Sequence, residues 1–155
     1  MKITLCGSIA FYPEMLETKN GLETLGHEIK LPPREVPDEN GKMIPVAQYY
    51  ELRKTITDQN SWVWQRKTEA MRNHFEKIVW SDVILVCNYD KKGISGYIGA
   101  NTLLEMGLAM YLKKPIYLLN QIPEIDYKEE ILGMRPKVIY GDFSAIRATV
   151  DIQHT

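Results

Sequence analysis

The stretch SDVILVCNYDKKGISGYIGANTLLEMGLAMYLKKPIYLLN, residues 81–120, decides the fold. It begins with a near-continuous apolar run, passes through a loop punctuated by glycines, continues as an apolar segment of helical length and ends in a second apolar run. Strands that are apolar on both faces are typical of parallel sheets covered by helices on either side. The stretch therefore predicts a strand, a helix and a second, parallel strand.

The same alternation continues in both directions along the chain. The other predicted elements are, in order, a strand at 3–9, a helix at 13–26, a strand at 27–32, a helix at 62–80 with Ser61 as its cap, a helix at 127–133, a strand at 137–140 and a closing helix at 141–150. Five parallel strands alternating with helices favour one α/β domain over residues 1–155. We expect a doubly wound, flavodoxin-like or Rossmann-like sheet with helices on both faces.

Residues 32–60 interrupt this pattern. Four prolines and the sequence DENGK predict a loop, followed by a short helix at about 48–54. We interpret the segment as an insertion or lid. The aromatic residues in and after it are expected to pack in the core or an interface rather than to stack on a ligand; they are Tyr49, Tyr50, Trp62 and Trp64.

The bulk composition restricts the class of ligand. Lys and Arg number 19 against 20 Asp and Glu, so the formal net charge is −1 and the pI is near 6.3. This balance supplies no positive field for a polyanion or an anionic membrane surface. Residues 93–112 approach bilayer-spanning length, but they include Glu105 and four glycines, which argues against a span. We expect a small-molecule partner, and neither a nucleic acid polymer nor a membrane.

The two cysteines indicate the cellular compartment, and the loops lack the known phosphate-binding motifs. Cys6 and Cys87 each lie in an apolar run that predicts a buried strand, and the start MKITLCGS lacks a signal-peptide pattern, so we expect reduced structural thiols in a cytoplasmic protein. Neither candidate ligand loop matches GxGxxG or GxxxxGK[ST], and no acidic pair follows the first strand to hold magnesium. The sequence therefore predicts no cofactor and no metal.

One carboxylate stands out as a candidate reactive group. In open parallel sheets, ligands bind beyond the carboxyl ends of the strands. In a helix that begins near Gly99, Asn101 and Glu105 lie four residues apart on one face, with Thr102 beside them. A carboxylate close to a helix N-terminus is stabilised in its ionised form, which would make Glu105 a usable nucleophile. The alternative is that Glu105 caps the helix or forms a structural ion pair.

Three segments carry a family resemblance. ITLCGSI, SDVILV and GANTLLEMGLAMYLKKPIYLL resemble the nucleoside 2-deoxyribosyltransferase superfamily, which includes 2′-deoxynucleoside 5′-phosphate N-hydrolases and cytidylate hydrolases. NTLLEMGLA is similar to its motif GTxxELGxA, and the likeness runs from the first strand to KVIYGDFSAI. The resemblance implies that Glu105 attacks the anomeric carbon of a nucleoside, that the base leaves, and that water or another base resolves a ribosyl-enzyme ester.

The resemblance also suggests binding residues and an assembly. The first loop is expected to pack against the sugar and any 5′-phosphate, and the end of the 83–89 run to contact sugar hydroxyls or a base edge. A neighbouring subunit usually completes the site in this superfamily, so we expect a homodimer or a larger even homo-oligomer, with residues 129–136 as the reaching segment. The candidate substrate-binding residues are Gly7, Ser8, Ile9, Tyr12, Asn88, Asp90, Gly99, Asn101 and Thr102.

The chain also departs from the superfamily pattern. Gly99 stands where the transferases carry an aspartate, and His74, eight residues before Asp82, stands where the N-hydrolases carry another. His74 is therefore the candidate general acid, and its alternative is a half-exposed helix histidine. The first loop continues as AFYPE, whereas the phosphate-using members continue with glycines and arginines, so a 5′-phosphate requirement stays open.

Two other interpretations share a nucleotide-like ligand. One is a binding or sensing module that keeps the fold without turnover, because both aspartates are missing. The other is a phosphoribohydrolase of the cytokinin-activating type, whose GGxGTxxE motif has the spacing of GANTLLE. That family also has a glycine-rich first loop, which CGSIAF is not.

Overall fold

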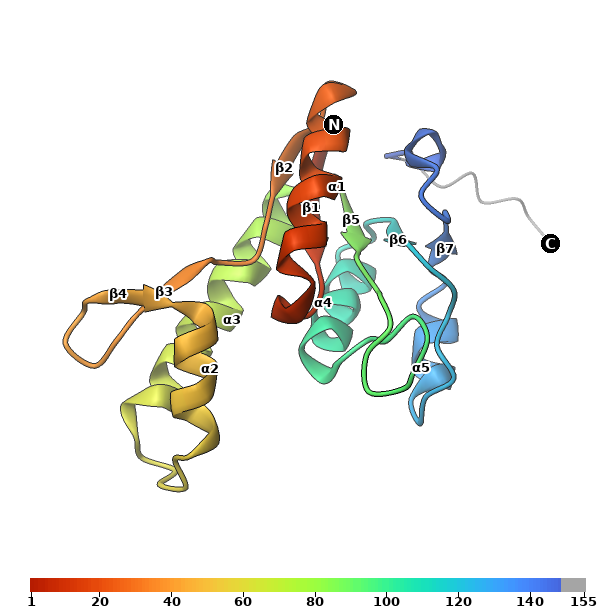
Figure 1. Cartoon of the computed structure of the whole chain (residues 1–155). Coiled ribbons are helices and arrows are strands. Elements are labelled where there is room, and N and C mark those ends of the chain that lie inside the picture. The colour runs from red at the N-terminus through yellow and green to blue at the C-terminus, as the bar shows by residue number, and fades with distance from the viewer. Residues whose placement is uncertain (149–155) are drawn as a thin grey trace.

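A five-stranded parallel sheet forms the centre of the molecule, as Figure 1 shows for the computed structural model, which describes residues 1–148. The strand order is β2-β1-β5-β6-β7, so the chain winds outward in both directions from β1 and β5. This confirms the predicted doubly wound α/β architecture. The strands are β1 (Lys2–Cys6), β2 (Glu28–Lys30), β5 (Val83–Val86), β6 (Ile116–Leu118) and β7 (Lys137–Val138).

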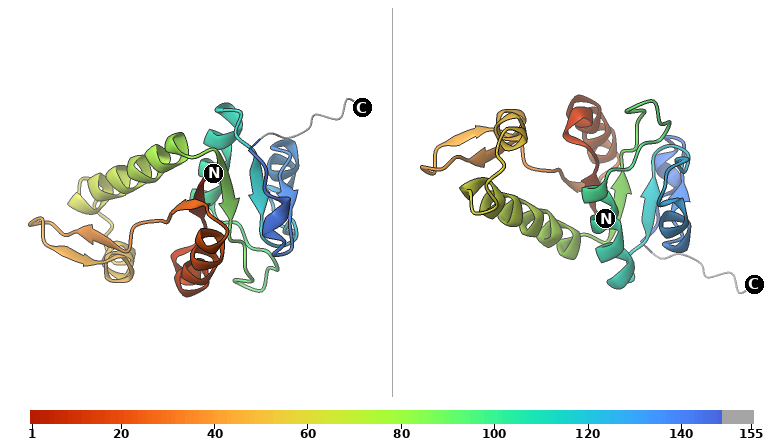
Figure 2. Two further views of the ribbon diagram at one scale, coloured as in Figure 1. Left: turned by 90° about the horizontal axis from the view of Figure 1, so that it is seen from above. Right: turned by 90° about the horizontal axis from the view of Figure 1, so that it is seen from below.

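Helices cover both faces of the sheet, as views from above and from below show (Figure 2). On one face α1 (Tyr12–Thr24) packs Met15 and Leu22 against Ile3 and Leu5 of β1. The other face carries α3 (Trp62–Trp80), α4 (Ala100–Tyr111) and α5 (Lys128–Gly133), which pack around Cys6 of β1. Neighbouring strand residues point to opposite faces, so Cys6 faces α3 and α4 while Leu5 faces α1.

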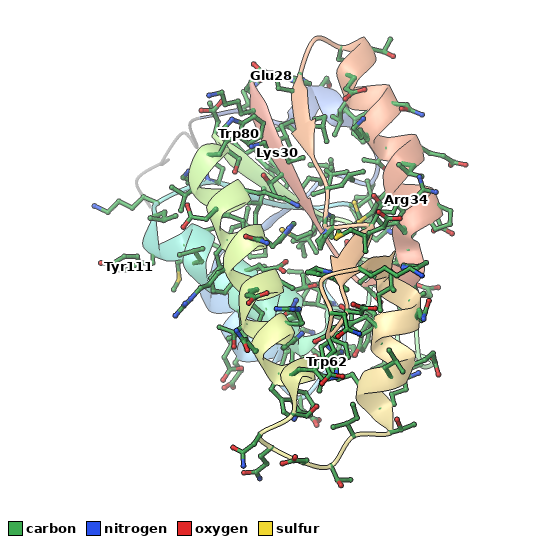
Figure 3. All side chains as sticks on the ribbon, turned by 90° about the vertical axis from the view of Figure 1, so that its left-hand side faces the viewer. Glu28, Lys30, Arg34, Trp62, Trp80 and Tyr111 are labelled. Carbon is green, nitrogen blue, oxygen red and sulfur yellow. The ribbon has the colours of Figure 1, made fainter. Side chains whose placement is uncertain are left out.

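The longest helix begins and ends where the sequence predicts. Ser61 caps α3 by accepting a hydrogen bond from the Val63 backbone N–H at 3.4 Å. At the other end, Trp80 lies beside the edge strand β2, where the Lys30 Nζ atom is 4.2 Å from the centre of its ring (Figure 3). Charged side chains on an edge strand discourage pairing with another chain.

Residues 32–60 are more ordered than the predicted loop. They form an antiparallel hairpin of β3 (Glu35–Pro37) and β4 (Met43–Pro45), followed by α2 (Val46–Lys54). Asp38 closes the turn, because its Oδ1 accepts from the backbone N–H groups of Asn40 and Lys42, both at 2.9 Å. The strands are only three residues long and each ends in a proline, so periodicity alone does not reveal them.

The hairpin and α2 form a small core of their own against the first turns of α3. Val36, Ile44, Val46, Tyr49 and Val63 are buried together there, and the Tyr49 hydroxyl donates to the Val63 carbonyl at 2.5 Å. The expectation that Tyr49 packs in a core is therefore confirmed. This unit, residues 35–54, lies to one side of the sheet, next to α3 (Figure 1).

The predicted closing helix at 141–150 is wrong for its described part. Only a single 3₁₀ turn, η2 (Phe143–Ala145), forms, and Thr149 and Val150 lie outside the described residues. Asp142 accepts from the Ser144 N–H at 3.1 Å, a local bond that competes with helical pairing, and Ile146 is extended. Phe143 nevertheless packs on Gly21 of α1 and covers the same sheet face that a helix would.

Other local differences are small. The first strand ends at Cys6 rather than at residue 9, because Ile9–Phe11 form a 3₁₀ turn, η1, that leads into α1. Both cysteines are buried free thiols, as expected. Among residues 1–148, no helix is both long and apolar enough to span a bilayer.

Candidate active site

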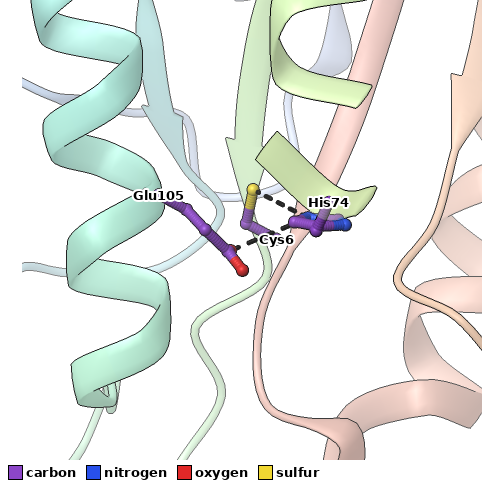
Figure 4. Close-up of side chains that lie close together, drawn as sticks. All are labelled: Cys6, His74 and Glu105. Atoms are coloured by element: carbon purple, nitrogen blue, oxygen red, sulfur yellow. Dashed lines mark hydrogen bonds and ion pairs between the residues drawn. The ribbon is translucent and has the colours of Figure 1, made fainter. Parts of the chain in front are cut away.

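Cys6, His74 and Glu105 meet in one buried cluster at the carboxyl end of β1 (Figure 4). The His74 Nε2 atom lies 3.5 Å from the Cys6 Sγ atom and 3.7 Å from the Glu105 Oε2 atom. The three residues are 0%, 3% and 4% exposed, respectively. From the sequence, His74 and Glu105 were separate candidates, and Cys6 was predicted only to be a buried structural thiol.

The fold explains why these three residues converge. Cys6 is the last residue of β1 and points to the face that α3 and α4 cover. His74 lies on the side of α3 that faces the sheet, and Glu105 lies in the second turn of α4, which packs beside α3. Glu105 also accepts a hydrogen bond from the Asn101 amide at 3.4 Å, one turn earlier on the same helix face.

A cavity opens beside this cluster, between the sheet edge and the unit formed by the hairpin and α2. Its cavity volume is about 50 Å³, which is room for a few water molecules and is below the roughly 300–1,000 Å³ typical of small-ligand sites. The lining residues are Gly7, Ile9, Pro32, Pro33, Val36, Val46, Tyr49, Tyr50, Arg53, Lys67, Ala70, Met71, His74, Asn101 and Glu105.

Five of the candidate residues from the sequence therefore line one cavity: Gly7, Ile9, His74, Asn101 and Glu105. Among the described residues, no lysine or arginine forms an ion pair with Glu105; the basic side chain within 4.0 Å is His74, whose Nε2 atom lies 3.7 Å from Glu105 Oε2. The alternative interpretation of His74, a half-exposed helix histidine, is wrong, because the ring is buried.

The other candidates lie outside this lining. Asn88 is fully buried and joins the ends of β5 and β6, because its amide donates to the Gln121 carbonyl at 3.0 Å and accepts from the Asn120 N–H at 2.9 Å. Asp90 accepts from the Gly96 N–H at 3.1 Å within the glycine loop.

The remaining candidates hold the first loop and the start of α4. The Ser8 hydroxyl accepts from the Lys91 ammonium at 2.8 Å, and Tyr12 has the Arg34 guanidinium 5.9 Å from its ring centre. Gly99 is the N-cap of α4 and Thr102 is buried in its first turn. The Ser8 and Tyr12 contacts join the first loop to Lys91 of the glycine loop and to Arg34, which precedes β3.

Two basic side chains in the cavity lining, those of Arg53 and Lys67, were not predicted from the sequence as site residues. The Arg53 guanidinium lies 4.2 Å from the centre of the Tyr50 ring, and its Nη1 atom is buried without a hydrogen-bond partner among the described residues. Burial and then the Arg53 charge lower the pKa of Lys67, whereas the nearby Glu105 raises it. The sequence offered one signal for this contact, because Tyr50 and Arg53 are three residues apart on α2 and side chains at that spacing are neighbours on a helix.

Burial dominates the protonation of the cluster. It raises the pKa of Glu105 to about 7, against the opposing effects of a Cys6 hydrogen bond and the charges of Lys67 and Lys77. Burial, followed by the Lys77 charge, lowers the pKa of His74 to about 4. The pKa of the Cys6 thiol is raised well above its usual value by burial and by Glu105. At neutral pH the thiol is therefore protonated, the imidazole is neutral and Glu105 is near its titration midpoint.

This corrects the expectation that the helix start keeps Glu105 fully ionised. The helix dipole acts mainly within the first turn, and Glu105 lies in the second. Loss of hydration outweighs the Cys6 hydrogen bond and the charges of the two lysines. The general-acid role of His74 stays a prediction, because the free protein holds this ring neutral at neutral pH.

Comparisons with known proteins give distant structural similarities. No protein-family model matches the chain, and no curated protein matches it. The chain is similar in structure to a 2-deoxyribosyltransferase from the psychrotolerant bacterium Bacillus psychrosaccharolyticus, with 21% identity and a TM-score of 0.48, over 76% of this chain and 71% of that one. It is also similar to the CMP N-glycosidase BcmB of Clostridium botulinum, with 15% identity and a TM-score of 0.47, over 90% of this chain and 86% of that one. Neither similarity assigns a role to a residue of this chain.

Proposed function

We propose that this protein cleaves or transfers the N-glycosidic bond of a nucleoside or nucleotide, with Glu105 as the nucleophile. The observation that carries the proposal is the position of Glu105, the acidic residue in the described lining of the cavity, at the carboxyl end of the central strands. Its place within NTLLEMGLA agrees with the family resemblance of that segment.

In the proposed reaction a Glu105 oxygen forms a bond to the anomeric carbon as the bond from that carbon to the base nitrogen breaks. The electron pair of the broken bond stays on the base, which takes up a proton. Water or a second base then attacks the same carbon and releases the carboxylate. An anion against one face of the sugar stabilises an oxocarbenium-like transition state, and the covalent ester divides one difficult displacement into two easier ones.

The protonation of Glu105 suits this role. A carboxyl group with a pKa of about 7 is ionised in a large fraction of molecules at neutral pH, and it lacks the hydration shell that would weaken its attack. Lys67 and Lys77 supply the positive charge that favours the ionised form. In this proposal His74, whose Nε2 atom lies 3.7 Å from the Glu105 Oε2 atom, holds the carboxylate in position and exchanges a proton with it.

Arg53 and Lys67 favour a substrate with an anionic substituent, such as a 5′-phosphate. A buried guanidinium nitrogen without a partner is costly unless a ligand supplies an acceptor. Arginine binds phosphate oxygens in a bidentate geometry, and a lysine beside it adds a point charge. In this proposal the unit of residues 35–54 acts as the lid that carries Arg53 to the substrate.

Base release provides the test. The full chain is incubated with a panel of nucleosides and their 5′-monophosphates, and free base is separated chromatographically. Glu105→Gln keeps the shape of the side chain and should abolish release, whereas Glu17→Gln, an exposed residue of α1, should leave it unchanged. Intact-mass analysis of quenched reactions should show one added sugar on the wild-type chain. Equal release by wild type and Glu105→Gln would refute the proposal, and tight binding without release would favour the sensing module.

A further inference from the structure

The separations within the Cys6, His74 and Glu105 cluster match those between the ligands of one metal ion. Each residue offers one ligand atom, and these three atoms lie within 4.8 Å of one another. Tetrahedral zinc geometry, with bonds of about 2.3 Å to sulfur and about 2.0 Å to nitrogen or oxygen, implies sulfur–nitrogen and nitrogen–oxygen separations of about 3.5 and 3.3 Å. The corresponding distances here are 3.5 Å and 3.7 Å. Two of the three separations therefore lie within a few tenths of an ångström of zinc geometry, and the third, between the Cys6 sulfur and a Glu105 oxygen, is at most 4.8 Å.

The chemistry of the three ligands indicates which ions fit. A thiolate, an imidazole and a carboxylate together favour a borderline-soft divalent ion such as Zn²⁺ over Mg²⁺ or Ca²⁺, which prefer oxygen ligands only. His74 contacts both other residues through the same atom, Nε2. The ring is thus oriented with one nitrogen aimed at the centre of the cluster.

The charge balance also favours a cation at this point. A thiolate and a carboxylate together neutralise a divalent ion, and a bound metal ion deprotonates its cysteine ligand outright. Lys67 and Lys77 act within reach of Glu105 and oppose a further positive charge. They act from outside the cluster, however, whereas the three ligand atoms would contact the ion directly.

We propose that Cys6, His74 and Glu105 bind one Zn²⁺ ion, with the fourth coordination position open to the cavity. His74 binds through the lone pair of Nε2, the Cys6 thiol releases its proton to the buffer, and Glu105 binds as the carboxylate. His74 and Glu105 line the cavity, so a water molecule or a ligand atom can reach the fourth position. While the ion is bound, this site excludes the proposed glycosidic reaction, because the ion occupies the Glu105 oxygen needed for attack.

Titration of the untagged, reduced full chain with Co²⁺ alone tests this site without any substrate. Cobalt bound to a thiolate gives a sulfur-to-metal charge-transfer band in the near ultraviolet and ligand-field bands typical of tetrahedral coordination. We expect both bands to saturate at one Co²⁺ per chain and to disappear on addition of one equivalent of Zn²⁺. Absence of the charge-transfer band with Co²⁺ in large excess would overturn the proposal.

Cys6→Ala and Cys87→Ala form a matched pair of variants. Both cysteines are fully buried at the ends of neighbouring strands, but Cys87 belongs to the core on the opposite face of the sheet. Loss of an outer partner of a metal ligand already weakens binding by roughly 10- to 100-fold, so loss of Cys6 itself should weaken it by more than about 100-fold. Cys87→Ala should bind as the wild type does, and loss of the band in Cys87→Ala instead would overturn the assignment.

A third variant covers the case in which Cys6→Ala fails to fold. Glu105→Gln should keep the charge-transfer band and weaken Co²⁺ binding by at least about 10-fold, since it removes a charged ligand but leaves the thiolate. Unchanged affinity in a folded Glu105→Gln chain would exclude Glu105 as a ligand and refute the three-residue site.

Discussion

Replacing Glu105 by glutamine should stabilise the protein at high pH, because the buried carboxylate is costly once it ionises. The pKa of about 7 in the folded protein compares with 4.5 for an ordinary glutamate. At about 1.4 kcal/mol for each pKa unit, this difference corresponds to about 3 kcal/mol of unfolding free energy. Glutamine has the same shape and no charge, so the variant does not carry this pH-dependent cost.

The direction of the effect follows from proton linkage. A carboxyl group whose pKa is higher in the folded state than in the unfolded state contributes its full stability below the unfolded value. That contribution is lost as the pH rises from 4.5 through about 7, because the unfolded chain releases its proton first. Above that window both states are ionised and the difference stays constant.

Urea unfolding of wild type and Glu105→Gln, with a chelator present, measures this quantity. The unfolding free energy of the variant minus that of the wild type should rise by about 3 kcal/mol between about pH 4 and pH 8. Titration of His74 occurs in both proteins and largely cancels in the difference. Glu17→Gln serves as the control for removing one exposed negative charge. A difference that stays constant between pH 4 and pH 8 would show that Glu105 is hydrated in the folded protein, and the argument from burial would fail.

Three further predictions concern the cavity and its support. Arg53→Ala should lower kcat/KM for nucleoside 5′-monophosphates by about 10-fold or more, and it should change kcat/KM for free nucleosides little. Base release measures both values, and Arg72→Ala, at an exposed arginine, is the control. Lys67→Met removes a charge that lowers the pKa of Glu105, so the rising limb of the kcat/KM profile, expected near pH 7, should move to higher pH. Asn88→Ala leaves the Asn120 N–H without its acceptor and should cost about 1–3 kcal/mol in urea unfolding; an unchanged midpoint would show that water replaces the amide.

The sequence by itself determined the sheet, its covering helices and the position of Glu105. Near-continuous apolar strands, helical spacing and the Ser61 cap are local signals, and the structure confirms β5, α3 and α4 within a few residues. The side-chain alternation of a strand and the 3.6-residue period of a helix likewise depend on neighbouring residues alone. These two local periodicities were sufficient to predict that Glu105 lies near the carboxyl ends of the central strands.

Only the tertiary structure decided what surrounds Glu105. Cys6 and His74 are 68 residues apart in the chain and meet because α3 crosses the face of the sheet toward which Cys6 points. Arg53 reaches the same cavity because a hairpin of two three-residue strands folds back onto α3. Such contacts depend on how packed elements cross, which no local pattern encodes. The pKa of Glu105 also depends on those contacts. Burial in the assembled fold raises this pKa by more than the position of Glu105 near the helix start lowers it.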